Sequence, residues 1–319
     1  MTTQNSIDRD STDRVRADSV ELPDLEVRID IPATEPVAIA GRRSQASPWR
    51  VFFRKPSTLF FGPLLVVIAL VSFVGPFFVG DPVSTAHPVL APPSLEYPLG
   101  TDQLGRDYLA RVVYGGQVSL LVGFSVAFLC MTFGLLVGGL AGYYGGAIDT
   151  GLVKIAEFFQ VLPGLVLALV AAALLGSNML IIVSILAITM WPGVGRIVRA
   201  EAMRISQLGY VESAKAAGFS GARIIWSDVI PNAMPPVLVA TSMTVGRAIL
   251  IESGLAYLGI GDTNRPSWGA LLNSAQSYMQ SAWWLAVFPG ALIFLTVLAV
   301  NMLGDGMNDS FNPTAGRVK

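Results

Sequence analysis

Residues 119–142 read SLLVGFSVAFLCMTFGLLVGGLAG and carry no charged side chain. A helix that crosses a lipid bilayer needs about 20 consecutive, mostly apolar residues, so this stretch predicts a membrane-spanning helix. Glycines recur at every fourth position in it and just after it, at Gly134, Gly138, Gly142 and Gly146. That spacing places small residues on one helix face, where the backbone of a neighbouring helix can approach closely.

Five more apolar runs of comparable length lie in the chain, at residues 59–78, 153–175, 179–197, 234–258 and 284–303. The turn Gly176-Ser177-Asn178 separates the third span from the fourth, and Pro163 within the third is of a type that often kinks or breaks membrane helices. The composition agrees, because 13% of the residues are charged, whereas soluble proteins are about 25% charged. We therefore predict an all-α integral membrane protein with six transmembrane helices.

Basic residues orient these predicted helices, because cytoplasmic loops of membrane proteins are enriched in Lys and Arg. If the N-terminus lies inside, the outer loops, at about 80–115 and 259–283, hold only Arg106, Arg111 and Arg265. Nearly all other basic residues then fall in inner segments. The pattern therefore predicts that both termini are cytoplasmic.

The longest inner loop contains residues 201–232, which read EAMRISQLGYVESAKAAGFSGARIIWSDVIPN. Residues 210–217 predict a short helix that ends at Gly218, because glycine commonly follows the last helical residue. Ser220 is a residue type that caps helix starts, so a second short helix is expected from there to about Pro231. Two such helices would form a compact knob suited to a socket on a cytoplasmic partner.

This loop carries an ordered set of residues, namely Glu212, Ser213, Ala214, Gly218, Ile230 and Pro231. Their spacing resembles the Glu-Ala-Ala, three residues, Gly, then Ile-x-Leu-Pro pattern in permease subunits of ATP-binding-cassette importers. In that family the loop supplies a coupling helix that docks in a groove of the ATPase, so the resemblance implies ATPase coupling by these residues. Ser213 departs from the pattern at the middle alanine, and Asp228 stands where the pattern has isoleucine.

Three other stretches are similar to the dipeptide, oligopeptide and nickel permeases, specifically to their second, shorter type of subunit. They are Tyr-Pro-Leu-Gly-Thr-Asp with Gly-Arg-Asp at 97–107, Pro-Ser-Trp-Gly at 266–269, and Phe-Pro-Gly with Asn-Met-Leu-Gly-Asp-Gly and Asp at 288–309. With the loop they cover about residues 50–313. The resemblance therefore implies the importer permease fold.

The expected division of the chain follows from the spans and the resemblance. Residues 1–47 are charged and lack an apolar pattern, which is typical of a flexible tail, here cytoplasmic. The first transmembrane helix with its outer loop (48–112) comes next. The remaining parts are the transmembrane permease domain (113–307), its coupling loop (199–232) and a cytoplasmic C-terminal tail (308–319).

The resemblance also implies the function and the partners. The chain would form half of a translocation path for peptides in a bacterial cell membrane, among lipid, in a heterodimer with a homologous second permease. Two ATPase subunits or domains would bind ATP and Mg, and an extracytoplasmic binding protein would deliver the substrate. The chain itself would hold no cofactor and catalyse nothing. Related permeases carry nickel chelate, haem or other small solutes, so these cargoes remain alternatives.

Other functions find little support in the residues. No lysine follows a glycine, as a P-loop requires, and a net charge of −1 leaves no basic excess for nucleic acid. The single Cys130 and single His87 exclude Cys-rich or His-rich metal sites. A membrane-embedded enzyme or scaffold would need a carboxylate set such as Asp102, Asp107, Asp305 and Asp309. The predicted topology places the first two outside and the last two inside, so they cannot meet.

Three ionisable residues, Glu157, Arg247 and Glu252, fall at membrane depth. Such residues usually face a bundle interior, an aqueous path or a partner. Arg247 and Glu252 are five positions apart on a helix and point to different sides, so we expect them along the translocation path or at the interface with the second permease. For Glu252 a structural role is an equal alternative. Glu157 is expected to form a helix-surface ion pair with Lys154.

Overall fold

The apolar runs of the sequence form long helices in a computed structural model of the chain. It describes three stretches, residues 48–161, 163–262 and 265–311. These lie in one compact unit, Ala46–Lys319. The predicted tail at 1–47 and most of the predicted tail at 308–319 lie outside the described residues.

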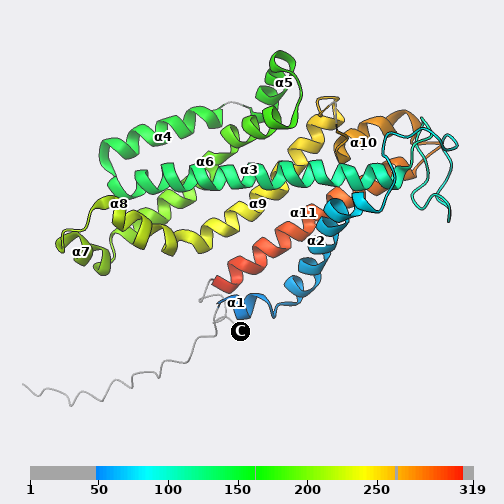
Figure 1. Ribbon diagram of the computed structural model, residues 1–319. Coiled ribbons are helices and arrows are strands. Elements are labelled where there is room, and N and C mark those ends of the chain that lie inside the picture. The colour runs from blue at the N-terminus through cyan, green and yellow to red at the C-terminus, as the bar shows by residue number, and fades with distance from the viewer. Residues whose placement is uncertain (1–47, 162, 263–264, 312–319) are drawn as a thin grey trace, which may run out of the picture. The chain divides into compact units, whose positions relative to one another are not determined.

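The described residues form helices joined by turns and loops, without a β-strand (Figure 1). The helices are α1 (Pro48–Phe52), α2 (Pro56–Val74), η1 (Gly75–Phe77), α3 (Tyr108–Tyr144), α4 (Gly146–Val161), α5 (Gly164–Leu175), α6 (Met179–Ser206), α7 (Gly209–Ala216), α8 (Gly221–Ile224), the π-helical turn η2 (Ile225–Val229), α9 (Ile230–Tyr257), α10 (Trp268–Ala275), η3 (Gln276–Tyr278) and α11 (Trp284–Phe311).

Five helices in the described part of the chain are long and apolar enough to cross a membrane, or six if α4 and α5 together make one span. The third span, expected as one run over 153–175, is instead divided into two helices bent by 75°. Pro163 lies at the division, where its extended backbone precedes α5. By contrast, Pro192 and Pro289 lie inside the continuous helices α6 and α11.

The turn expected between the third and fourth spans is confirmed. Gly176 follows α5 with φ +86°, a conformation that glycine adopts without steric cost. Asn178 then caps α6, since its side-chain oxygen accepts a hydrogen bond from the N–H of Ile181 at 2.9 Å. The cap satisfies a helix-terminal donor, so the sequence defines where α6 begins.

The glycine face of α3 packs against α6, which lies beside it (Figure 1). A Cβ added at Gly138 would meet the backbone oxygen of Gly195, and one at Gly142 would meet the backbone oxygen of Arg199. The predicted close approach is therefore confirmed at these positions. Gly146 is an exception, because α3 ends at Tyr144 and Gly146 begins α4 with no heavy atom within 4 Å of a built Cβ.

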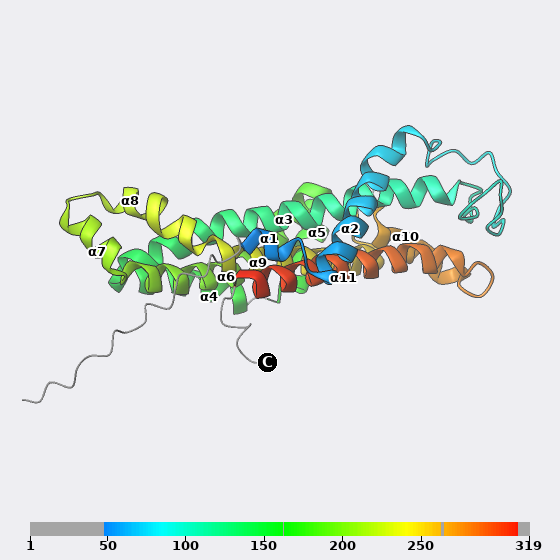
Figure 2. The same ribbon diagram turned by 90° about the horizontal axis from the view of Figure 1, so that it is seen from below.

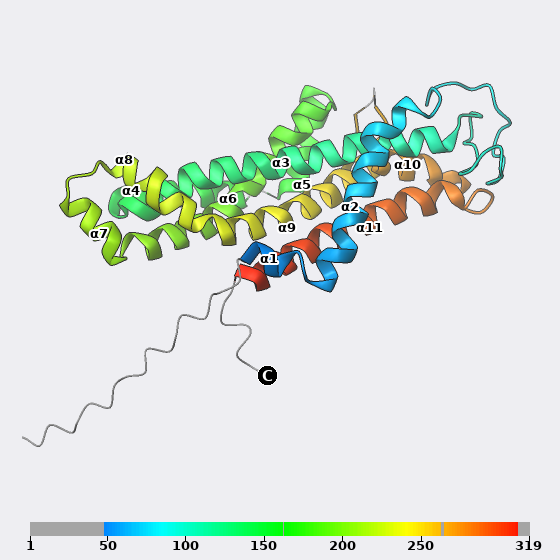
Figure 3. The ribbon, with the colours of Figure 1, turned by 60° about the horizontal axis from the view of Figure 1, so that its bottom comes forward.

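The remaining long helices complete the bundle around α3. Helix α9 contacts both α3 and α11, and α2 crosses α11 (Figure 3). Near this crossing Lys55 Nζ lies 3.0 Å from an Asp309 carboxylate oxygen, and the rings of Trp49 and Phe311 meet edge to face. The first and last described helices are thus joined at one end of the bundle.

Candidate functional site

The loop between α6 and α9 forms a knob, defined as residues 207–229, at the end of α3 opposite to α10 (Figures 1 and 2). Lys215 of α7 lies 5.1 Å from the ring centroid of Tyr143, near the C-terminus of α3. The first short helix of the knob is confirmed as α7. It ends at Ala216, and Gly218 follows the C-cap residue Ala217 with φ +81°. The next N–H, of Phe219, donates to the carbonyl of Ala214 at 3.2 Å.

The second short helix of the knob was predicted to end near Pro231, and this prediction is wrong. The helix that starts at Gly221 does not stop near Pro231 but runs through to Tyr257 as 37 continuous residues. A proline within a helix removes one N–H donor and crowds the preceding turn. Here that irregularity is absorbed in the wider π-helical turn η2, and the side-chain amide of Asn232 donates to the carbonyl of Asp228 at 2.6 Å. The second helical segment of the knob is therefore continuous with α9.

Some residues of the family pattern are exposed on the knob, and others pack in its interior or at its base. Glu212 is exposed on α7, and the Ser213 hydroxyl donates to the carbonyl of Gly209 at 2.8 Å. Ala214 packs against the buried cluster under the knob. Ile230 is buried separately, beside Gly139 of α3, and Pro231 is exposed. Their role in ATPase coupling stays a prediction.

The knob has an apolar base and an apolar outer surface. Its base is a buried cluster of Ala202, Ile205, Val211, Ile224, Val229 and Ala233. Its exposed large side chains are Leu208, Tyr210, Phe219 and Trp226, with exposed fractions of 38–59%. The sequence interpretation missed these side chains, although aromatic residues in a loop otherwise rich in small and polar residues were a visible signal. Large apolar side chains exposed in one loop are candidates for an interaction surface.

At the opposite end of α3, a buried carboxylate organises the loop between α2 and α3. Asp102 is 0% exposed, and it accepts hydrogen bonds from the backbone N–H groups of Leu104 (2.8 Å) and Arg106 (2.9 Å). It also pairs with the guanidinium groups of Arg106, at 2.6 Å, and of Arg111. Burial by itself raises the pKa of the Asp102 carboxyl, but these donors and charges together hold the pKa below its usual value.

We expect Asp102→Asn to lower the free energy of unfolding by about 3–5 kcal/mol at pH 7, because it leaves the buried guanidinium group of Arg111 and the half-buried one of Arg106 without their carboxylate. The folded-state pKa of Asp102 lies below the unfolded-state value of about 3.9. The carboxylate therefore stabilises the fold fully above that value and less as the pH falls through the folded-state pKa. Thermal unfolding in detergent at pH 7 and near pH 3 measures both effects, and the difference from wild type should shrink at the lower pH. The exposed Asp81, changed to Asn, is the control, and equal midpoints for Asp102→Asn and wild type at pH 7 would contradict the expectation.

Glu252 lies inside the bundle rather than on a surface. Its side chain is 2% exposed and accepts hydrogen bonds from the hydroxyl of Ser119 at 3.2 Å and of Ser253 at 3.4 Å. Ser267, which caps α10, also hydrogen-bonds the carboxyl group. Glu252 thus joins α9 to α3 and α10, a geometry that favours its structural alternative over a place on the path.

Arg247, on another side of α9, lines a cavity of about 580 Å³ that α6 and α9 form with residues of α4 and α5. We call it the arginine cavity, and its polar lining residues are Gln160, Thr189, Arg196, Thr244 and Arg247. Arg247 is exposed, and no ion pair or hydrogen bond joins its side chain to another described residue. Its expected place on the path or at an interface stays a prediction.

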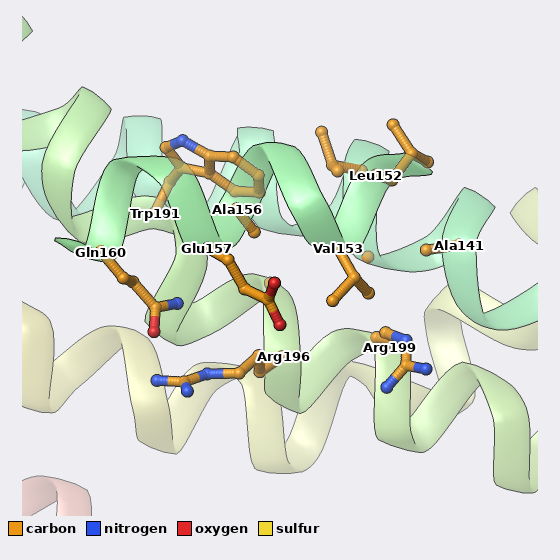
Figure 4. Close-up of a pocket in the computed structure, with 12 residues that line it drawn as sticks. Ala141, Leu152, Val153, Ala156, Glu157, Gln160, Trp191, Arg196 and Arg199 are labelled. Atoms are coloured by element: carbon orange, nitrogen blue, oxygen red, sulfur yellow. The ribbon is translucent and has the colours of Figure 1, made fainter. Parts of the chain in front are cut away.

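A smaller pocket of about 70 Å³ lies between α4 and α6. Figure 4 shows Glu157 and Gln160 of α4 extending toward Arg196 of α6. The expected ion pair of Glu157 with Lys154 is absent from the described part of the chain, because the Glu157 side chain turns to α6 instead. Arg199 in the same pocket pairs with Asp149 at 2.5 Å.

The described stretches hold no group of three His, Cys, Asp or Glu side chains arranged to bind a metal ion. The carboxylates considered for an enzyme alternative also have local partners. Asp102 pairs with arginines and Asp309 with Lys55, while Asp107 caps α3 by accepting from the N–H of Leu109 at 3.0 Å. Asp102 and Asp107 lie in the loop that leads into α3, whereas Asp309 lies near the C-terminal end of α11.

A bundle in which five or six helices of the described chain are long and apolar enough to cross a membrane defines a multi-pass membrane protein. Comparison with known proteins gives the family. Residues 134–317 match the binding-protein-dependent transport system inner membrane component family, and the chain belongs to this family. It is a permease subunit of an ATP-binding-cassette importer, which confirms the resemblance in the sequence.

Relatives of known name support the same family. The dipeptide transport system permease protein DppC of Alkalihalophilus pseudofirmus is 35% identical over 274 residues, covering 84% of this chain and 90% of its own. The glutathione transport system permease protein GsiD of Pectobacterium atrosepticum is 34% identical, covering 85% and 93%. Among solved structures, an inward-facing MetNI methionine ABC transporter is 18% identical with a TM-score of 0.52, covering 64% of this chain and 98% of that one. This last likeness shows the fold.

Proposed function

We propose that the chain is one permease of a peptide importer and forms half of its translocation path. It pairs with a homologous second permease, and two ATPase subunits or domains that bind ATP and Mg attach to the knob. An extracytoplasmic binding protein supplies the substrate, and this chain holds no catalytic residue. Peptide is the proposed substrate because relatives that match most of the chain are named dipeptide and peptide transport permeases.

The observation that carries this proposal is the exposed apolar knob at the end of helices longer than a bilayer. Helix α3 has 37 residues, or about 55 Å at about 1.5 Å per residue, whereas the hydrocarbon core is about 30 Å thick. The helices thus have the length to hold the knob clear of lipid, where its exposed apolar side chains would gain by binding a protein. Arg199 and Arg204 lie in the last two turns of α6, which leads into it, and this basic end favours a cytoplasmic position for the knob and both termini.

Tyr210→Ala in the knob is expected to weaken ATPase binding by about 2 kcal/mol, roughly a 30-fold change in dissociation constant, since exposed aromatic residues dominate such interfaces. Tyr257→Ala is the matched control, because Tyr257 is similarly exposed, at 42% against 47%, and lies at the other end of the α8–α9 helix. The tagged chain is purified with its partners, and the ATPase recovered with each variant is quantified together with ATP-driven peptide uptake in vesicles. Absence of ATPase from the wild-type preparation, or equal recovery with both variants, would contradict the proposal.

A further inference from the structure

One face of the membrane-spanning helix α9 is exposed and carries a charged side chain, for which lipid is a poor environment. Met243, Arg247 and Leu250 are exposed on this face, while the residues on either side of Arg247 are buried. Their spacing of four and three residues puts them in line on the helix. A charged side chain in a membrane-spanning segment faces an aqueous path or a partner, so this line of α9 is not a lipid-facing surface.

The arginine cavity beside this face offers hydrogen-bond donors with positive charge. The hydroxyl of Thr244 donates to the carbonyl of Ala240 at 2.8 Å, and that of Thr189 donates to the carbonyl of Ile185 at 3.0 Å. Both hydroxyl protons are thus used within their own helices. The donors left for a ligand are the guanidinium groups of Arg247 and Arg196, with the amide of Gln160.

The described lining of the arginine cavity carries positive charge without acidic side chains. The described residues that line the arginine cavity include no Asp or Glu. Glu157 extends toward Arg196 from α4 in the neighbouring pocket (Figure 4), whereas no acidic side chain among the described lining residues accompanies Arg247, so Arg247 is the principal group for an anion. A guanidinium group binds a carboxylate through two parallel hydrogen bonds. The volume of about 580 Å³ is within the range of about 300–1,000 Å³ for small-molecule sites.

We propose that the arginine cavity is a wall of the translocation path and that Arg247 binds the carboxylate group of the passing substrate, with Arg196 at the margin. This inference rests on the proposed function and adds the substrate chemistry of the path. It assigns to Arg247 the recognition of a free carboxyl terminus, the group that a peptide keeps whatever its side chains are.

The test uses the whole complex in vesicles, with Cys130→Ala removing the only native thiol and Met243→Cys placing a reporter beside Arg247. A negatively charged and a positively charged methanethiosulfonate reagent are applied, and each rate is divided by that of a small thiol in solution. We expect the anionic reagent to react at least about threefold faster than the cationic one. One positive charge near the thiol, in a partly aqueous site, attracts the anionic reagent and repels the cationic one to about this extent. Arg247→Gln should bring the ratio near one, and Arg247→Lys should keep it.

Lys154→Gln is the matched control, since it removes an exposed cation from α4 outside the lining of the arginine cavity and should leave the ratio unchanged. Alanylalanine should slow the modification during ATP turnover, and its carboxyl-terminal amide should slow it less. If Met243→Cys impairs assembly, Ile197→Cys, on the α6 side of the same cavity, replaces it.

Three outcomes would overturn the inference. They are no reaction with either reagent, a ratio unaffected by Arg247→Gln, and loss of the second permease on Arg247→Gln, which would make Arg247 the partner of an acid on that subunit. Each is read in a parent complex that retains ATPase subunits and ATP-driven uptake. Failure of the proposed function would instead remove those two properties from the parent itself.

Discussion

Gly218→Val is expected to abolish peptide uptake and substrate-stimulated ATP hydrolysis, with at least a tenfold loss of each, while the chain still inserts in the membrane. Gly218 has φ +81°, a region that costs a residue with a side chain about 1–2 kcal/mol and that a β-branched residue rarely adopts. No heavy atom lies within 4 Å of a built Cβ there, so backbone conformation and not crowding is what the change disturbs. The angle between α7 and the helix that follows it would then change. The exposed side chains of α7 would no longer be oriented correctly for an ATPase.

Two other variants separate this cause from general damage to the knob. Gly209→Ala, at the start of α7, also has an open Cβ position but lacks a positive φ, and it should keep uptake near the wild-type level. Gly218→Asn should be milder than Gly218→Val, because Asn tolerates the left-handed region. The measurements are uptake in reconstituted vesicles, ATPase activity and membrane content. Wild-type uptake by Gly218→Val would mean that the knob is not the coupling element.

The double variant Gly138→Ala and Gly142→Ala is expected to lose a large share of the stability of the bundle. Each new methyl group would lie against the backbone of α6, which cannot rotate away as a flexible side chain can. Overpacking of this kind costs about 1–3 kcal/mol at each position, a large share of the usual total of about 5–15 kcal/mol. Close backbone approach is also the main source of helix association in lipid, so the change should separate α3 from α6.

Thermal unfolding in detergent and the amount of protein in the membrane measure this loss. The control is Gly139→Ala combined with Gly151→Ala, which adds the same number of methyl groups. At Gly139 the nearest atoms to a built Cβ lie 4.0 Å away, on Ile230, and at Gly151 none lies within 4 Å. The prediction fails if both double variants unfold at the same temperature.

The sequence predicted correctly where the membrane-spanning helices lie, but not which of them are interrupted at a proline. Apolar length identified the helices, but Pro163 ends one helix whereas Pro192 lies inside another. The difference comes from packing, since α6 lies against the glycine face of α3 and a break in α6 would forfeit that contact. Likewise, Pro231 does not end the knob's second helix, because the π-helical turn before it accommodates the ring. Neither outcome is visible in a local pattern.

In the candidate sites, too, local patterns were predictable from the sequence whereas long-range contacts were not. Helical spacing correctly indicated that Arg247 and Glu252 point to different sides of α9, but not which one points inward. That depends on Ser119 and Ser267, which are distant in sequence and hydrogen-bond the Glu252 carboxyl. Turn chemistry, in contrast, is local, so Gly218 was correctly expected after α7, as was the Gly176-Ser177-Asn178 turn between α5 and α6.

The contact between α2 and α11 has a consequence for synthesis in the cell. Lys55 and its partner Asp309 are 254 positions apart, and ribosomes add about 5–20 residues per second. The first membrane helix is therefore made about 13–50 s before the helix that covers it. During that interval the α11-facing side of α2 is in contact with lipid or with the insertion machinery, and any chain that stops before α11 keeps it exposed. Only a chain that has completed its last helix covers this side of α2 from within its own fold.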